Sequence, residues 1–148
     1  MFALVMCVLT GGCSLVTQSW NVVFGPTQLH TLSVVVGAHA NHDTAVSMDL
    51  VLVHDEATYE SLTRIKAADW FANRDDWSRQ YQQQIAISSW ELVPGSNLKV
   101  PVRRLTDGAV GFVVFANYPG ERPHRVQFKG IGQVTVILKE NDMEAIPG

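Results

Sequence analysis

The first 42 residues of this 148-residue chain contain no Asp, Glu, Lys or Arg, and Asp43 is the first charged residue. Cysteine is equally scarce, because the chain has only Cys7 and Cys13, so no disulfide can form within the part that follows Cys13. The net charge of −3 is spread without a basic patch, which argues against nucleic acid and against an electrostatic membrane surface as partners. There is also no Gly-x-Ser-x-Gly motif and no glycine-rich phosphate loop. The sequence therefore predicts neither an enzyme nor a cofactor-binding protein.

The N-terminal segment does carry a chemical signal. Met1 to Leu9 is an uncharged apolar run with the length of a signal-peptide core, about half of what a membrane-spanning helix needs. Leu9 to Ser14, which reads Leu-Thr-Gly-Gly-Cys-Ser, resembles a bacterial lipobox. That resemblance implies removal of residues 1–12, lipidation of Cys13 as a stable membrane anchor, and, with Ser14 in the second mature position, sorting to the outer membrane.

A second interpretation of this segment stays open, in which it is a buried apolar N-terminus and Cys13 is incidental. Residues 13–30 are uncharged and rich in small and polar side chains, which is typical of a short tether. Val22, Val23 and Phe24 are consecutive apolar residues, so we expect part of this tether to pack on the fold or to pair at a sheet edge.

Length and composition favour one folded domain over residues 31–148. About 135 residues follow Cys13, which is enough for one hydrophobic core and too few for two ordinary domains. Apolar residues make up 47% of the chain and four of its residues are Trp, which indicates a packed globule and not a disordered tail.

Most of this domain has the pattern of short strands separated by turn signals. Seven strands are predicted, over Leu32–Val36, Met48–Val53, Ile85–Val93, Leu98–Val102, Val110–Tyr118, Arg125–Phe128 and Gln133–Lys139. The first two are expected to form an antiparallel pair with a projecting polar loop over Ala38–Ser47. Gly111 to Ala116 is predicted to be a central strand because it is apolar on both faces. This spacing predicts a mainly β protein with a two-sheet β-sandwich.

Residues 55–81 instead show helical spacing, so a short helical insertion is predicted between strands. It contains Trp70, Phe71, Trp77 and Tyr81, which are expected to pack onto the sheet. The adjacent acidic residues at 55–56 and at 75–76 are better explained as helix-start charges than as a general acid and base.

The projecting loop offers a second weak signal. His39 and His42 have a His-x-x-His spacing next to Asp43, which suits a metal only if a distant ligand joins them. No such ligand is evident, so we interpret the loop as solvated and predict no metal site.

The order of these elements resembles the TssJ family, the small outer-membrane lipoprotein of the type VI secretion membrane complex. The resemblance covers Leu32 to Leu138 and includes Asp69-Trp70-Phe71 in the insertion, Pro94-Gly95 after a strand, and Gly111 to Tyr118 followed by His124-Arg125-Val126. It implies a transthyretin-like sandwich whose loop between the first two strands contacts the periplasmic part of the large inner-membrane subunit.

In this chain the corresponding loop is Ala40 to Ala45, with Asn41, His42, Asp43 and Thr44 as candidate partner-binding residues. The loop is shorter than is usual in the family. The implied function is therefore structural, joining the outer membrane to a partner that spans the periplasm.

A different class of function also fits the sequence. A free-standing periplasmic lipoprotein could hold a sugar or a peptide through the aromatic insertion around Trp70, Phe71 and Trp77. The two hypotheses predict different structures, because the second requires these aromatic side chains to line an accessible apolar cleft.

Overall fold

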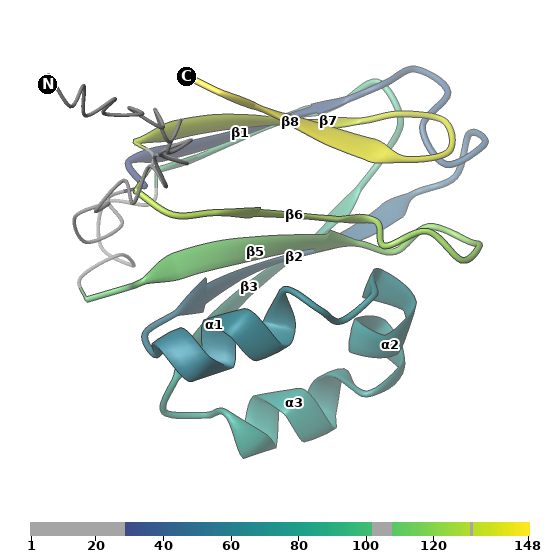
Figure 1. Ribbon diagram of the computed structural model, residues 1–148. Coiled ribbons are helices and arrows are strands. Elements are labelled where there is room, and N and C mark those ends of the chain that lie inside the picture. The colour runs from purple at the N-terminus through teal and green to yellow at the C-terminus, as the bar shows by residue number, and fades with distance from the viewer. Residues whose placement is uncertain (1–28, 102–107, 131) are drawn as a thin grey trace, which may run out of the picture.

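In the computed structural model, which describes residues 29–101, 108–130 and 132–148, eight strands form two four-stranded sheets (Figure 1). One sheet has the order β4-β1-β7-β8 and the other the order β3-β2-β5-β6. The strands are β1 (Thr31–Val36), β2 (Val46–Val53), β3 (Ile85–Leu92), β4 (Asn97–Pro101), β5 (Gly111–Ala116), β6 (Arg125–Phe128), β7 (Gln133–Leu138) and β8 (Met143–Pro147). The predicted mainly β, two-sheet sandwich is confirmed.

Seven strands were expected, and the structure adds β8 at the C-terminal end of the chain. This strand pairs antiparallel with β7, from Leu138 opposite Met143 to Val134 opposite Pro147. It is five residues long, and Glu144 and Pro147 interrupt its apolar pattern. Edge strands tolerate such residues because one of their sides pairs with no other strand, so the usual strand signal is weak there.

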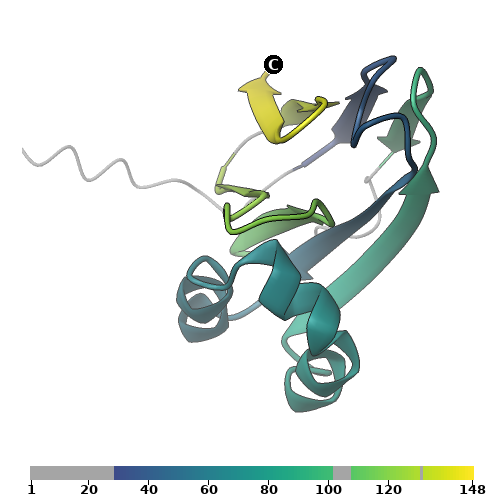
Figure 2. The same ribbon diagram turned by 90° about the vertical axis from the view of Figure 1, so that its right-hand side faces the viewer.

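The prediction that the first two strands form an antiparallel pair is wrong. β1 lies between β4, which is antiparallel to it, and β7, which is parallel to it, whereas β2 lies between β3 and β5 in the other sheet. The connection from β1 to β2 therefore crosses from one sheet to the other, as Figure 2 shows. Alternating apolar residues specify a strand with one buried face, but they do not specify which neighbour completes its hydrogen bonds.

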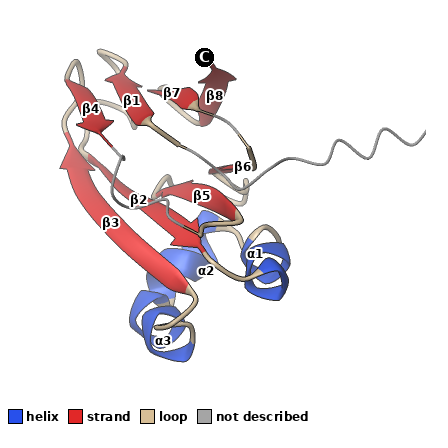
Figure 3. Ribbon diagram, turned by 90° about the vertical axis from the view of Figure 1, so that its left-hand side faces the viewer, coloured by secondary structure: helices blue, strands red, loops and turns tan. Residues whose placement is uncertain are grey.

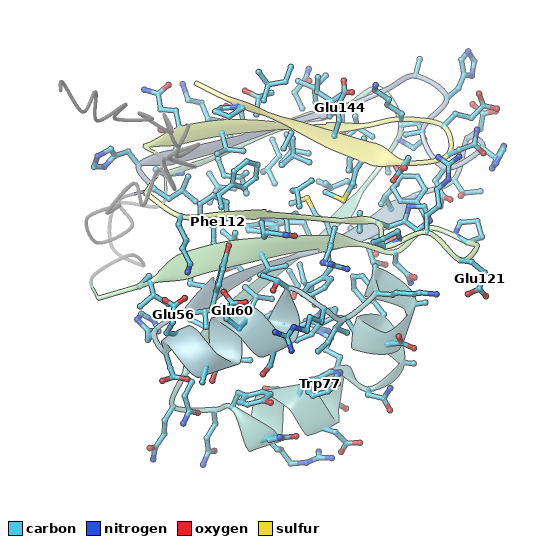
Figure 4. All side chains as sticks on the ribbon, in the orientation of Figure 1. Glu56, Glu60, Trp77, Phe112, Glu121 and Glu144 are labelled. Carbon is cyan, nitrogen blue, oxygen red and sulfur yellow. The ribbon has the colours of Figure 1, made fainter. Side chains whose placement is uncertain are left out.

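The main core fills the space between the two sheets. Leu32 and Val34 of β1 and Val134 and Val136 of β7 face it from one sheet, and all four are at most 1% exposed. Phe112, labelled in Figure 4, enters it from β5 of the other sheet. β5 is buried along its whole length and lies between β2 and β6, so it is an interior strand as predicted.

The helical insertion covers the outer face of the sheet that contains β2 and β5 (Figure 3). It consists of three short helices, α1 (Glu56–Leu62), α2 (Ala67–Ala72) and α3 (Arg74–Gln80). Asp55 begins α1 as its N-cap, because its carboxylate accepts the backbone N–H of Thr58 at 2.8 Å. The predicted helix-start role of this residue is confirmed.

A second apolar cluster lies between the helices and the sheet. Trp70 of α2 is fully buried and stacks on Phe115 of β5, with the ring centroids 4.8 Å apart and the planes 5° from parallel. Val51, Val53 and Val113 of the sheet belong to the same cluster. This second cover explains why β5 is apolar on both faces and why Val51 and Val53 of β2 are buried.

Candidate functional site

The four candidate residues Asn41 to Thr44 lie in the nine-residue connection Gly37–Ala45 between β1 and β2. This connection is at the end of the sandwich where the β3–β4, β5–β6 and β7–β8 turns also lie, on the right in Figure 1. We call this end of the molecule, with its four connections, the loop end. His42, Asp43 and Thr44 are exposed there, and Asn41 is partly buried.

The backbone of the connection is held in an unusual conformation. Asn41, His42 and Asp43 have φ angles of 47°, 51° and 62°, so three consecutive non-glycine residues are left-handed. Such a conformation persists only where surrounding contacts hold it, and strain of this kind is typical of functional segments. Two of these contacts are local, since Asn41 Nδ2 donates to the carbonyl of Ala45 at 3.0 Å and Thr44 Oγ1 donates to the carbonyl of Asn41 at 2.5 Å.

The base of the connection is attached to the rest of the fold. Ala40 is fully buried and contributes to the main core. The N–H of Asn41 donates to the carbonyl of Lys139 at 3.2 Å, and the N–H of Gly37 donates to the carbonyl of Leu138 at 2.8 Å. Ala40 is small to fit the core, so its side chain is not available to a partner. His39 and the residues from Asn41 to Ala45 remain accessible.

Two imidazoles make ionic contacts at the surface of this loop. His39 Nδ1 lies 2.9 Å from Asp43 Oδ1, and this hydrogen bond and the charge of Asp43 raise the pKa of His39 above its ordinary value. His42 Nδ1 lies 3.4 Å from Glu140 Oε1 in the β7–β8 turn. Each histidine thus faces a different carboxylate, and within the described parts of the chain no three such side chains gather as they would around a metal ion.

A second network joins the β5–β6 connection to the β7–β8 turn. Asp142 accepts a hydrogen bond from His124 Nδ1 at 2.9 Å and another from Arg122 at 3.2 Å. Tyr118 donates its hydroxyl to the carbonyl of Lys139 at 2.8 Å, and its ring contacts the ring of His124 with the centroids 5.1 Å apart. The loop end is therefore one connected, ordered surface and not four independent loops.

Sequence reasoning missed this supporting network. Partial desolvation by itself raises the pKa of Asp142, but the bonds from the N–H of Met143, His124 and Arg122 outweigh it and hold that pKa below its ordinary value. His124 is 3% exposed, with a left-handed φ of 41°. The only signal in the sequence was the His-Arg pair after Pro123, and nothing in it indicated the distant partner Asp142.

The aromatic insertion does not form the cleft that sugar or peptide binding would need. Trp70 is fully buried, and Trp77 is stacked on Tyr81 with the ring centroids 6.0 Å apart. A depression of about 290 Å³ does lie beside the insertion. Its lining is mostly polar and comprises Ser47, Asp49, Phe71, Arg74, Ser89, Trp90 and Glu91. Of the three aromatic residues proposed for binding, only Phe71 reaches it.

The remaining sequence predictions concern residues outside the described ranges. Cys13, the signal peptide 1–12 and nearly all of the tether 13–30 precede Leu29, the first described residue. Within the described ranges, no helix has the length and apolar character needed to cross a membrane.

The fold defines a class of protein. It is a two-sheet sandwich with one parallel strand pair, β1 with β7, and a helical insertion that covers the sheet containing β2 and β5. No protein-family model matches the sequence, and no curated protein matches it.

Several solved structures with this fold come from type VI secretion systems. The lipoprotein TssJ1 from Pseudomonas aeruginosa superposes with a TM-score of 0.66 at 14% identity, over 83% of this chain and 98% of that one. Serratia marcescens Lip, described as a membrane bound component of the Type VI Secretion System, has a TM-score of 0.56 at 13% identity, over 81% and 99%. A chain from a structure described as the TssM C-terminal domain from EAEC has a TM-score of 0.61 at 16% identity, over 80% and 98%. The resemblance to TssJ structures is confirmed for the fold.

Proposed function

We propose that this chain is a structural lipoprotein of a type VI secretion membrane complex. In this proposal Cys13 carries lipid that holds the protein on the periplasmic face of the outer membrane. The loop end binds the periplasmic part of the large inner-membrane subunit. The chain then links the two membranes mechanically and catalyses no reaction.

The observation that carries the proposal is the combination of this sandwich with an ordered, strained loop at one end. The neighbours in structure are described as lipoproteins and membrane-bound components of this secretion system. In the chain itself, Asn41 to Asp43 are held left-handed by bonds within the loop and by attachment to the β7–β8 turn. Binding to a preformed loop costs little conformational entropy, because the loop is already ordered. A small contact with it can therefore be specific.

The chemistry of the loop fits a polar contact. His42, Asp43 and Thr44 project donors and acceptors from a rigid scaffold, and Glu140 lies beside His42. A lipid tether at Cys13 raises the effective concentration of this surface for a partner that spans the periplasm.

The test replaces Asn41, His42 and Asp43 with Gly and Thr44 with Ser, and measures co-purification with the periplasmic domain of the inner-membrane subunit. Glycine accepts the left-handed backbone at all three positions, so the thermal midpoint is expected to change little. Capture of the subunit is expected to fall at least about tenfold, since a few central residues usually carry most of the binding energy.

A matched control changes Gln82 and Gln83, which are exposed in the connection from α3 to β3 at the opposite end of the sandwich. Replacing them with Gly and Ser should leave capture at the wild-type level. Wild-type capture by the loop variant would contradict the proposed interface, and the helical insertion would then be the next surface to test.

A further inference from the structure

Four strands form the outer edges of the two sheets, and three of them carry features that discourage pairing with another chain. β4 is five residues long and contains Lys99 and Pro101. β8 is also five residues long and contains Glu144 and Pro147. β6 is only four residues long and begins at Arg125. Short length, charge and proline are the usual means by which native proteins protect sheet edges.

β3 has only one of these protections, a single charge. It is eight residues long, reads Ile-Ala-Ile-Ser-Ser-Trp-Glu-Leu, and contains no proline and a single charge, Glu91. Its pairing with β2 is regular from Ile85 opposite Val53 to Leu92 opposite Val46, so no bulge twists it away. Figure 3 shows β3 as the outermost strand of its sheet, and in the described parts of the chain no strand pairs with its outer side.

We propose that β3 pairs antiparallel with β3 of a second copy of this chain, joining two sheets into one of eight strands. A two-fold axis through Ser88 sets the register. It places Ala86 opposite the partner's Trp90, Ile87 opposite the partner's Ser89, and Ile85 opposite the partner's Glu91.

This register satisfies the steric requirements of a continuous sheet. Residues directly opposite in an antiparallel pair point to the same face. Met48 belongs to the main core, so Trp90, which lies opposite it, faces the core side of the sheet, and so does Ala86. Trp90 is only partly buried at the open edge of the core. The small side chain of Ala86 from the second copy leaves room for this indole and extends its cover.

The charges near the edge also permit the pairing. The two Glu91 residues lie about 20 Å apart, because each is displaced six residues from the other along the paired strands. Glu91 already accepts a hydrogen bond from Ser47 at 2.7 Å, and Arg74 is paired with Asp49 at 2.8 Å. The contact therefore keeps the two Glu91 carboxylates apart. A closed two-fold arrangement is also the commonest symmetry of protein assemblies.

A cysteine at the proposed axis tests the register directly. The full chain with Cys7→Ala and Cys13→Ala receives Ser88→Cys, is oxidised under mild conditions at roughly 100 μM, and is examined on a non-reducing gel. High concentration is needed because a single strand pair is a small contact, of the size typical of transient association. Opposite residues have Cβ atoms about 4.5–5.5 Å apart, close to the span of a disulfide, so a covalent dimer is expected.

The matched control is Ile146→Cys in the same background. Ile146 is 52% exposed on β8, which is also an edge strand but has the protections described above. We expect this variant to give at most about a tenth of the covalent dimer that Ser88→Cys gives. Equal crosslinking by both variants would show random collision and would overturn the proposal.

Sedimentation velocity of the otherwise unmodified full chain provides an independent measurement. Ser89→Lys places a charge at an exposed position of β3, where the wild-type hydroxyl accepts a hydrogen bond from Arg74. It is expected to raise the dimer dissociation constant at least about tenfold, whereas Ile146→Lys should change it less than about twofold. A monomeric wild type at all concentrations would overturn the proposal. So would a chain that dimerises only after residues 1–28 are removed, because its own N-terminal segment would then occupy the edge.

Discussion

Trp70 Nε1 donates a hydrogen bond of 2.9 Å to Asp49 Oδ2, and this bond ties α2 to the centre of β2. The side chain of Asp49 is only 2% exposed, and its second partner is the guanidinium of Arg74, whose Nε lies 2.8 Å away. A buried carboxylate is costly unless such donors satisfy it. The bond therefore fixes the position of the helical insertion on the sheet, which apolar packing alone does not specify.

Trp70→Phe removes the indole N–H and keeps an aromatic ring against Phe115. We expect the free energy of unfolding to fall by about 1–3 kcal/mol, because Asp49 loses one of its buried donors. Urea denaturation of the purified protein measures the change.

Trp77→Phe is the matched control for this substitution. The indole N–H of Trp77 is buried and has no hydrogen-bond partner among the described residues, so its removal forfeits no bond seen in the structure. If Trp70→Phe lowers the free energy of unfolding no more than Trp77→Phe does, the contact with Asp49 contributes no stability.

Phe112→Asp should prevent folding. Phe112 is fully buried between the sheets and contacts the ring of Phe128, with the centroids 5.2 Å apart. An unpaired carboxylate at this position costs several kcal/mol against a total stability of about 5–15 kcal/mol. Far-ultraviolet circular dichroism and solubility measure the outcome, and Val35→Asp, at a position 41% exposed, should fold normally. A cooperatively melting Phe112→Asp protein would contradict the observed core.

The ordinary pKa of the Asp142 side chain is 3.8, and below this pH Asp142 makes the free energy of unfolding depend on pH. Its pKa in the folded protein lies below that value, so the stabilisation is fully present above about pH 4 and is lost as the pH falls through the lower, folded pKa. Asp142→Asn should be less stable than the wild type at pH 7, and the difference should shrink as the pH falls below about 4.

Chemical denaturation at pH 7, 5, 4 and 3 tests this pH dependence. The control is Asp75→Asn, at an exposed position of α3. Its free energy of unfolding is expected to change across the series as that of the wild type does. A constant difference between wild type and Asp142→Asn across the series would show that the contacts of Asp142 with His124 and Arg122 do not stabilise its charged form.

Metabolic labelling with a palmitate analogue tests the proposed anchor in cells. The wild type should carry the label, and Cys13→Ser should not, because only a thiol at this position receives the lipid. Cys7→Ser serves as the control and should be labelled like the wild type, since residues 1–12 are removed in the proposed processing. An unlabelled wild type would end the anchor proposal.

Much of the fold followed from local patterns. Alternation over Gln133–Leu138 and the apolar run Gly111–Ala116 predicted strands because side-chain direction has a period of two in a strand. Asp55 predicted a helix start as an acidic residue before a helical pattern, and the structure shows that it caps the helix through a short-range bond to Thr58. These signals are readable because the residues that produce them are close together in the chain.

The sequence located the candidate loop but did not predict its backbone conformation. The left-handed backbone at Asn41, His42 and Asp43 depends partly on the carbonyl of Lys139, almost one hundred residues away. The importance of His124 and Asp142 has the same origin, since the bond between them joins residues that are 18 positions apart in the chain.

The sequence by itself determined the class of fold, the place of the helical insertion and the position of the exposed loop, because periodicity and turn residues act locally. Only the tertiary structure decided that β1 and β2 lie in different sheets and that Trp70 is satisfied by Asp49 and therefore unavailable to a ligand. It also decided that, among the described strands, β3 lies at the edge of its sheet. These outcomes depend on which distant strands meet, and the hydrogen bonds that join strands are made by backbone groups that every residue except proline shares.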